Sequence, residues 1–248
     1  MAGAVLPIDA PTRAPRLGGI ESVAEFRSNS RVGIGTEVTY QAEGCEFPQT
    51  EVLRCFTDAT VPDKTFSGIG IEDAISEPFT IFAGVQCFVN SDQADFARRA
   101  REQLAAGRGR VLEEVLGAWG DGGTALDAGG SVVNAIALVD QELDDKYIGR
   151  GVIMMSRFDA VLADAGGALS SEDGVLQTIN GTPVFASGRI TPGTVYGFGS
   201  IVVEHSPTSE YQATQHETNK HFALAEEQVV LAVDCEFRVH SATTADNG

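Results

Sequence analysis

Hydrophobic and polar positions recur along this chain with spacings that predict a mixture of strands and helices. A nearly continuous apolar run over residues 79–90 predicts a buried strand. Small and apolar residues then recur at helical spacing over residues 92–117, which predicts the longest helix, with Asp92 as its candidate cap. Gly107 and Gly109 interrupt this stripe, and we expect them to bend the helix, because a helical glycine costs about 1 kcal/mol relative to alanine.

The second half of the chain alternates between short helical and short extended patterns. A second helix is predicted from Ser131, a favourable N-cap, to Asp145. The shorter elements are a strand at 152–155, a helix at 158–163, and strands at 175–179, 182–186 and 195–204. Asn180-Gly181 predicts a hairpin turn between two of these strands. Apolar residues then alternate with mostly polar ones, which predicts one half-buried closing strand over residues 229–240.

The first 78 residues are dominated by turn formers. Residues 1–31 contain Pro7, Pro11 and Pro15 and show little periodicity, so we interpret them as an extended arm. Because a proline-rich arm would fray in a monomer, we expect a neighbouring subunit to hold it. Residues 36–75 alternate short β-prone pieces with turns, which predicts a long hairpin. A hairpin alone is marginally stable in water, so this one should lie on another surface.

Composition and charge narrow the class of protein. The 248 residues are 43% hydrophobic and 21% charged, close to the globular average, which excludes global disorder. The length allows one large domain or two small ones, with enough residues for a core. The 35 acidic and 17 basic residues give a net charge of −18, which opposes bulk attraction to DNA or anionic lipid. No apolar run approaches the roughly 18 residues of a membrane span. The first ten residues lack the pattern of a secretory signal, so we expect a cytoplasmic origin.

The four cysteines show no metal-site or redox motif. Cys45, Cys55, Cys87 and Cys235 include no CxxC pair, so we predict buried thiols in a reducing compartment. The alternative is a disulfide between Cys45 and Cys55 across the hairpin, which requires Cα atoms within about 7 Å.

The sequence contains few features typical of enzymes. The chain has no P-loop, no GxSxG and no HExxH motif. His216 and His221 flank Glu217 and would chelate a metal on a helix, but a solvated loop explains the segment equally well. We therefore predict no catalytic residue, no cofactor and no metal. The arginines between residues 98 and 110 are interpreted as members of salt pairs on a helix face, and Trp119 as a plug in the core or in an interface.

The order of these elements is more informative than any single motif. A basic arm, a long hairpin, one long helix, an α/β region and a closing strand resemble the major capsid proteins of tailed phages, whose Hong Kong 97-like fold is shared with encapsulin shells. Three strings resemble capsid proteins of actinobacterial phages: Ala83–Cys87, Tyr147–Ile153 and Gly174–Thr178.

The resemblance implies an α+β fold with defined parts. These are an N-arm at 1–31, an E-loop hairpin region at 32–78, a peripheral domain at 79–124 and 223–248 with spine helix 92–117, and an axial domain at 125–222. It implies a shell of pentamers and hexamers that encloses phage dsDNA without sequence-specific binding. The expected location is the virion, with assembly in the host cytoplasm, portal and scaffolding proteins as partners, and no membrane. The net negative charge predicts an acidic lumen away from the arm and the arginine stretch.

Contacts between subunits are expected from the arm, the hairpin and the end of the long helix. The candidate residues are Arg13, Arg16, Arg27, Arg31, Lys64, Phe66 and Trp119. Some relatives crosslink a lysine of the hairpin to a neighbour, and Lys64 is the only lysine there, but no partner residue can be assigned. The arm is short and begins at Met1, so scaffolding is expected to come from another protein.

Three alternatives stay open. The first is an encapsulin-type compartment with the same fold. The second is a soluble α/β enzyme with an unrecognised site. The third is another virion part, such as a tail tube, although the long helix at 92–117 favours a shell subunit over a mostly β tube.

Overall fold

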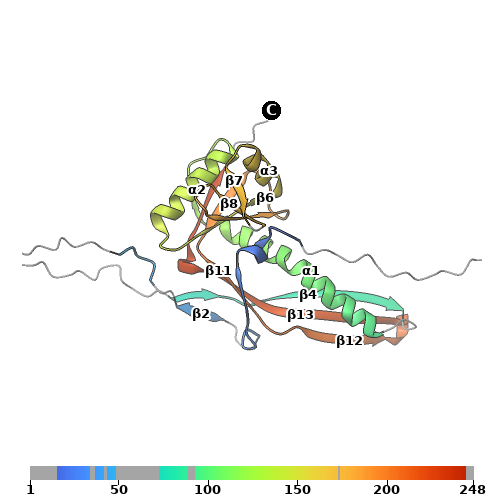
Figure 1. Cartoon of the computed structure of the whole chain (residues 1–248). Helices are drawn as coiled ribbons and strands as arrows, with labels where there is room; N and C mark the ends of the chain where they lie inside the picture. Colours follow the sequence, from blue (N-terminus) through green and yellow to red (C-terminus); the bar gives the residue numbers. More distant parts are fainter. Residues whose placement is uncertain are drawn as a thin grey trace, which may run out of the picture.

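Two sheets and one long helix organise the molecule (Figure 1). The computed structural model describes residues 16–33, 37–41, 44–48, 73–88, 93–172 and 174–243. Within these residues helix α1 (Gln93–Gly120) packs along the five-stranded sheet, and its C-terminal end reaches the seven-stranded sheet. None of the described helices is both long and apolar enough to cross a bilayer.

The seven-stranded sheet is covered on both faces. Its order is β5 (Thr124–Ala125), β14 (Arg238–Ala242), β10 (Thr194–Phe198), β6 (Val152–Ser156), β9 (Pro183–Ser187), β8 (Val175–Thr178) and β7 (Leu169–Glu172). Ile153 and Met155 of β6 pack with α2 (Val132–Lys146) and α3 (Arg157–Ala165), whereas Val152 and Met154 pack with α1. All of β6 is therefore buried, as a strand covered on both faces requires.

The two short helices of this region begin at serine caps. The predicted cap Ser131 accepts a hydrogen bond from the backbone N–H of Asn134 at 3.3 Å, and α2 follows it. Ser156 accepts from the backbone N–H of Asp159 at 2.9 Å at the start of α3. Each cap satisfies one of the free N–H groups of a helix N-terminus, which is why these local sequences start helices where they do.

The five-stranded sheet is covered by α1 on one face. It contains β1 (Glu25–Ser28), β11 (Ile201–His205), β13 (Lys220–Val233), β12 (Ser209–Gln215) and β4 (Phe79–Phe88). The long strand β13 is central: β4 pairs with one of its edges, and β11 and β12 pair one after the other with the opposite edge. Burial alternates along β4 and β13, because only the residues that point toward α1 enter the core.

The predicted hairpin is confirmed at its base. Strands β2 (Val38–Gln41) and β3 (Asp73–Ser76) form an antiparallel ladder in which Val38 lies opposite Ser76. The part of the hairpin prediction that falls between residues 49 and 72 lies outside the described residues.

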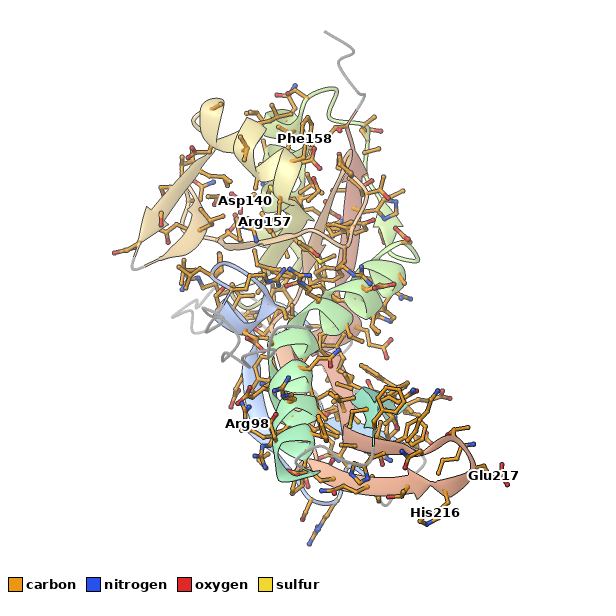
Figure 2. The ribbon with its side chains drawn as sticks, turned by 90° about the vertical axis from the view of Figure 1, so that its right-hand side faces the viewer. Arg98, Asp140, Arg157, Phe158, His216 and Glu217 are labelled. Atoms are coloured by element: carbon orange, nitrogen blue, oxygen red, sulfur yellow. A yellow bond between two sulfur atoms is a disulfide. The ribbon has the colours of Figure 1, made fainter. Side chains whose placement is uncertain are left out.

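Most of the helices, strands and turns predicted from short stretches of sequence are confirmed. The long helix is found at 93–120 and continues through both Gly107 and Gly109, while its ribbon bends along its length (Figure 2). Its candidate cap Asp92 lies outside the described residues. The helices at 132–146 and 157–165, the strand at 152–156 and the hairpin turn between β8 and β9 also match the predictions.

Two predicted strands are wrong. The predicted strand 195–204 consists of β10 and β11, which lie in different sheets. The predicted strand 229–240 consists of the end of β13, a 3-10 turn η3 (Asp234–Glu236) and β14. The apolar alternation continues through both interruptions because the chain passes from one core directly into the other. Cys235 and Glu236 turn the chain with φ values of 55° and 47°, which an alternating pattern does not reveal.

Sheet membership divides the chain differently from the predicted domains. Strands β11 and β12 fall inside the predicted axial segment 125–222, yet they pair in the five-stranded sheet. Strand β14 falls in the predicted peripheral segment but pairs in the seven-stranded sheet. The division into functional domains stays a prediction.

Residues 16–33 pack against their own chain. Ile20, in the short 3-10 turn η1 (Ile20–Ser22), is fully buried in the core beside α1, and Val32 is also buried. Strand β1 pairs in parallel with β11. Part of the predicted arm, residues 16–33, therefore packs on its own chain, and residues 1–15 lie outside the described residues. That a neighbouring subunit also holds the arm stays a prediction.

The two sheets meet where the chain passes between them twice. We call residues 199–200 and 234–237 the junction. Gly199 donates its N–H to the carbonyl of Phe237 at 3.1 Å, and Asp234 donates its N–H to the carbonyl of Ser200 at 2.9 Å. The hydroxyl of Tyr147 donates to the Asp234 carboxylate at 2.7 Å and accepts from the Ser200 N–H at 3.0 Å. The two passes therefore restrain each other.

The cysteine predictions are corrected by a long-range disulfide. Cys45 is bonded to Cys235, with Cα atoms 5.7 Å apart, so neither is a free thiol and Cys55 is not the partner of Cys45. Cys87 is a free, partly buried thiol, as predicted, and Cys55 lies outside the described residues. The bonded cysteines are 190 residues apart, a distance over which local sequence carries no pairing signal.

Candidate functional site

The histidine arrangement considered for a metal does not form. His216 and Glu217 lie at the exposed tip of the β12–β13 hairpin (Figure 2), whereas His221 is buried, with its Nδ1 3.1 Å from the Thr214 hydroxyl. Across the part of the chain that the structure describes, no three His, Cys, Asp or Glu side chains are placed to hold a metal ion.

A buried carboxylate anchors the N-terminal segment to α1. Glu113 is fully buried, and its Oε1 accepts from the guanidinium of Arg16 and from the N–H of Ile20 at 3.1 Å. Its Oε2 accepts from the hydroxyl of Ser187 at 2.7 Å. A buried carboxylate is tolerated only when its oxygens are bonded in this way. Burial, followed by the neighbouring charges of Arg110 and Arg157, lowers the pKa of Arg16. Arg16 thus binds its own chain.

The remaining predicted arginines lie on the surface. Arg27 pairs with Glu25, two residues away on the same strand, and Arg31 is exposed. Arg98 and Arg99 both pair with Asp95, one turn earlier on α1, which confirms the interpretation of these two as salt pairs on a helix face. Arg13, Lys64 and Phe66 lie outside the described residues. A role of the predicted residues in subunit contacts stays a prediction.

Trp119 contributes to the core of its own chain. Its indole stacks on Phe198, with ring centroids 6.0 Å apart, at the end of α1. The guanidinium of Arg238 lies 4.3 Å from the centre of the indole, and it donates to the Trp119 carbonyl at 3.0 Å. These contacts explain why the residue is partly buried.

One face of the five-stranded sheet leaves large apolar side chains exposed. Phe82 and Phe88 of β4 are 68% and 66% exposed, on the face opposite α1. Register places further apolar residues of the neighbouring strands on the same face: Leu224, Phe222 and Tyr211. We call these five residues the open sheet face.

A hollow of about 490 Å³ lies in the open sheet face. Gly84, in the middle of β4, contributes no side chain there, and Tyr211, Phe222 and Leu224 line the hollow around it. Its lining is mostly apolar, which is typical of a surface that receives an apolar part of another molecule.

Helix α3 carries its large apolar residues on the outside. Phe158 and Val161 are 60% and 69% exposed, and Leu162 is also exposed, whereas the small residues Ala160 and Ala163 face the core. An outer helix face with large apolar residues at positions i, i+3 and i+4 is the reverse of the usual arrangement on a solvated helix.

Neither apolar surface is among the contact residues predicted from the sequence. The alternation along residues 79–88 indicates a strand with two unlike faces, and the outward aromatics Phe82 and Phe88 are visible in it. In α3 the signal is the pair of alanines at the positions where a core-facing helix would carry larger residues. Exposed apolar patches of this kind mark protein–protein contact sites.

Comparison with known proteins assigns the fold. No family model matches the sequence, and no curated protein matches it. The structure titled Mycobacterium phage Che8 matches with a TM-score of 0.58 and 15% identity over 97% of each chain. The capsid of Ralstonia phage GP4 matches with a TM-score of 0.58 and 13% identity over 100% of this chain and 97% of that one. The capsid of an empty GTA particle computed with C5 symmetry matches with a TM-score of 0.58 and 12% identity over 97% and 96%.

The chain therefore has the α+β, Hong Kong 97-like fold of phage capsid subunits, as its order of elements predicted. The matches run from end to end, so each of these chains is similar to the whole molecule rather than to one part of it.

Proposed function

We propose that this chain is the major capsid protein of a tailed phage. Copies assemble through pentamers and hexamers into an icosahedral shell that encloses double-stranded DNA. The observation that carries the proposal is the likeness of the whole chain to capsid subunits, at a TM-score of 0.58 with nearly full coverage in both directions. Its place is the virion, after assembly in the host cytoplasm, with portal and scaffolding proteins as partners.

The exposed apolar surfaces support assembly with other copies. The open sheet face lies on the five-stranded sheet, whereas α3 covers the seven-stranded sheet. One subunit therefore offers apolar contacts at two separate places. A shell with closed symmetry repeats every contact many times, so modest contacts add up to a stable particle.

The charge of the chain suits a container for DNA. A net charge of −18 opposes adhesion of the wall to phosphate groups, and adhesion would hinder packaging and release. The described arginines do not reverse this balance: Arg16, Arg98 and Arg101 pair with carboxylates of their own chain. We infer that the shell encloses DNA without binding particular sequences.

Light scattering during size exclusion tests assembly and the role of the open sheet face together. The purified protein should elute as megadalton particles. A Phe82→Ser/Tyr211→Ser variant should keep its far-UV circular dichroism but elute as subunits or capsomers, because the apolar contact is lost. Thr80→Ser, on the same strand and face, is the matched control and should assemble normally. Elution of the wild-type chain as a monomer or dimer at every concentration would reject the proposal.

A further inference from the structure

The Cys45–Cys235 disulfide attaches a third chain segment to the junction of the two sheets. Cys235 lies in η3, between β13 and β14, and Cys45 lies in residues 44–48, which follow strand β2. The neighbouring Asp234 already holds both passes of the junction together through Ser200 and Tyr147. The disulfide therefore connects the hairpin region to the place where the two sheets are joined.

This bond is the main restraint that the structure shows on residues 44–48. No hydrogen bond or ion pair links these five residues to the other described residues. Glu46, Phe47 and Pro48 are exposed. Whether the disulfide is closed or open thus decides whether the segment is held on the junction.

The junction itself is a place where a covalent restraint matters. Cys235 and Glu236 adopt φ values of 55° and 47°, a left-handed conformation that is unfavourable for residues with a side chain. The turn is held by a hydrogen bond from the Phe237 N–H to the Asp234 carbonyl at 3.2 Å and by the bond to Cys45. Opening the disulfide removes one of these restraints.

We propose that Cys45 and Cys235 form a redox latch that is open while the subunit folds and assembles and closes after the particle leaves the cell. The timing rests on the proposed function, because a capsid assembles in a cytoplasm that keeps thiols reduced. Outside the cell no glutathione or thioredoxin system reopens the bond. Closing then pins residues 44–48 to the junction of an assembled shell.

Closing is an exchange with a small-molecule disulfide, such as oxidised glutathione. The Cys45 thiolate attacks one sulfur of the small disulfide, forms a mixed disulfide and releases one small thiolate. The Cys235 thiolate then attacks the Cys45 sulfur, forms the protein disulfide and releases the second small thiolate. The two protein thiols lose two protons and two electrons, and the small disulfide is reduced to two thiols.

The timing is tested by trapping thiols at cell lysis. Cells producing the full chain are lysed in excess iodoacetamide, and peptides are compared by mass spectrometry with those of particles purified in air. We expect alkylated Cys45 and Cys235 in the lysate and a linked Cys45–Cys235 peptide in the purified particles. A linked peptide already present in the lysate, or a Cys45–Cys55 peptide in the particles, would overturn the proposal.

The restraint is tested by stability and proteolysis in glutathione buffers. Oxidised glutathione should raise the thermal midpoint of the wild-type protein by several degrees over reduced glutathione. It should also slow cleavage by a glutamate-specific protease after Glu46 at least tenfold. Cys45→Ser, Cys235→Ser and the double variant should share one lower midpoint and show no response to glutathione. Cys87→Ser, the matched control at the free thiol, should respond as the wild type does. An equal midpoint and cleavage rate of the wild type in both buffers would overturn the latch.

These measurements separate the latch from the proposed function. The thiol-trapping and stability measurements use the full chain, and size exclusion shows its assembly state in each case. Particles without a redox response reject the latch alone, and a redox response in a protein that stays monomeric rejects the shell and the timing but keeps the restraint.

Discussion

The two sheets of this molecule reach burial in different ways. The seven-stranded sheet has α2 and α3 on one face and the end of α1 on the other, so its central strand β6 is buried throughout. The five-stranded sheet has α1 on one face only, and the opposite face exposes Phe82, Phe88 and Tyr211. The first region therefore completes its core within one chain, whereas the second leaves apolar area for another molecule to cover.

This difference separates residues that stabilise the subunit from residues that serve assembly. Side chains that point from β4 or β13 toward α1 should act on folding. Their neighbours, which point away from α1, should act mainly on association. Substitutions of adjacent residues can test this separation because the pleat of a strand sends successive side chains to opposite faces.

The largest effect is expected from Val233→Asp, at the end of β13. Val233 is buried in the core beside α1 and lies opposite Ile201. An unpaired carboxylate there should reduce the free energy of unfolding by about 3–5 kcal/mol, measured by urea denaturation. Leu224→Asp, on the open sheet face of the same strand, is the control and should cost at most about 1 kcal/mol. Equal losses for the two variants would mean that the two faces of β13 do not differ.

The next largest loss of stability is expected in β4, where two adjacent residues can be compared. Ile81 is buried against α1, and Phe82 is exposed on the opposite face. Ile81→Ala should lower the free energy of unfolding by about 2–4 kcal/mol, because it leaves a cavity. Phe82→Ala should lower it by about 0.5 kcal/mol or less, although it removes more atoms. Chemical denaturation of the unassembled subunit measures both, and a larger loss for Phe82→Ala would contradict the comparison.

A smaller loss of stability is expected when the buried carboxylate of Glu113 on α1 is removed. Glu113→Ala leaves Arg16, the Ile20 N–H and the Ser187 hydroxyl without their acceptor, at a cost of about 2–3 kcal/mol in the free energy of unfolding. Glu114→Ala is the matched control, since it breaks only an exposed pair with Arg189, worth about 0.5 kcal/mol or less. Thermal or urea unfolding distinguishes them, and similar midpoints for the two variants would show that the buried anchor is not required.

The smallest effect is a loss of stability at alkaline pH. Burial raises the pKa of Tyr40, at the hairpin base, to about 12. Burial, followed by the hydrogen bond to Asp121, also raises the pKa of Tyr196 in the seven-stranded sheet. A raised pKa means that the fold favours the neutral phenol. The stabilisation is thus complete below the ordinary value of 10 and is lost as the pH rises toward 12.

Urea midpoints between pH 9 and 11.5 measure this loss of stability, and variants of the two tyrosines show how much each contributes. Tyr40→Phe and Tyr196→Phe should each flatten the decline, and the variant with the larger change identifies the region that yields first. An unchanged decline in both variants would assign the alkaline loss to other groups.

Local signals account for the elements that the sequence predicted correctly. Helix α2 starts at the serine cap, and the β8–β9 turn sits at Asn180-Gly181, because these features depend on a few neighbouring residues. The strand 229–240 was wrong because an alternating pattern reads the same whether a strand continues or passes into a second core at Cys235.

Long-range features could not be predicted for a different reason. The pairing of Cys45 with Cys235 and the burial of Ile20 beside Glu113 depend on segments that only the complete fold brings together. The outward face of α3 was hidden because apolar residues are normally assigned to a core, and here Phe158 and Val161 point away from it. The candidate surfaces for assembly are thus the part of the molecule that required the structure.

Electron microscopy of the purified wild-type protein shows whether copies of this chain assemble into a shell. We expect closed particles of uniform diameter, with rings of five and six subunits visible after averaging. A homogeneous field of single subunits or dimers, at concentrations where the open sheet face should be covered, would contradict this expectation.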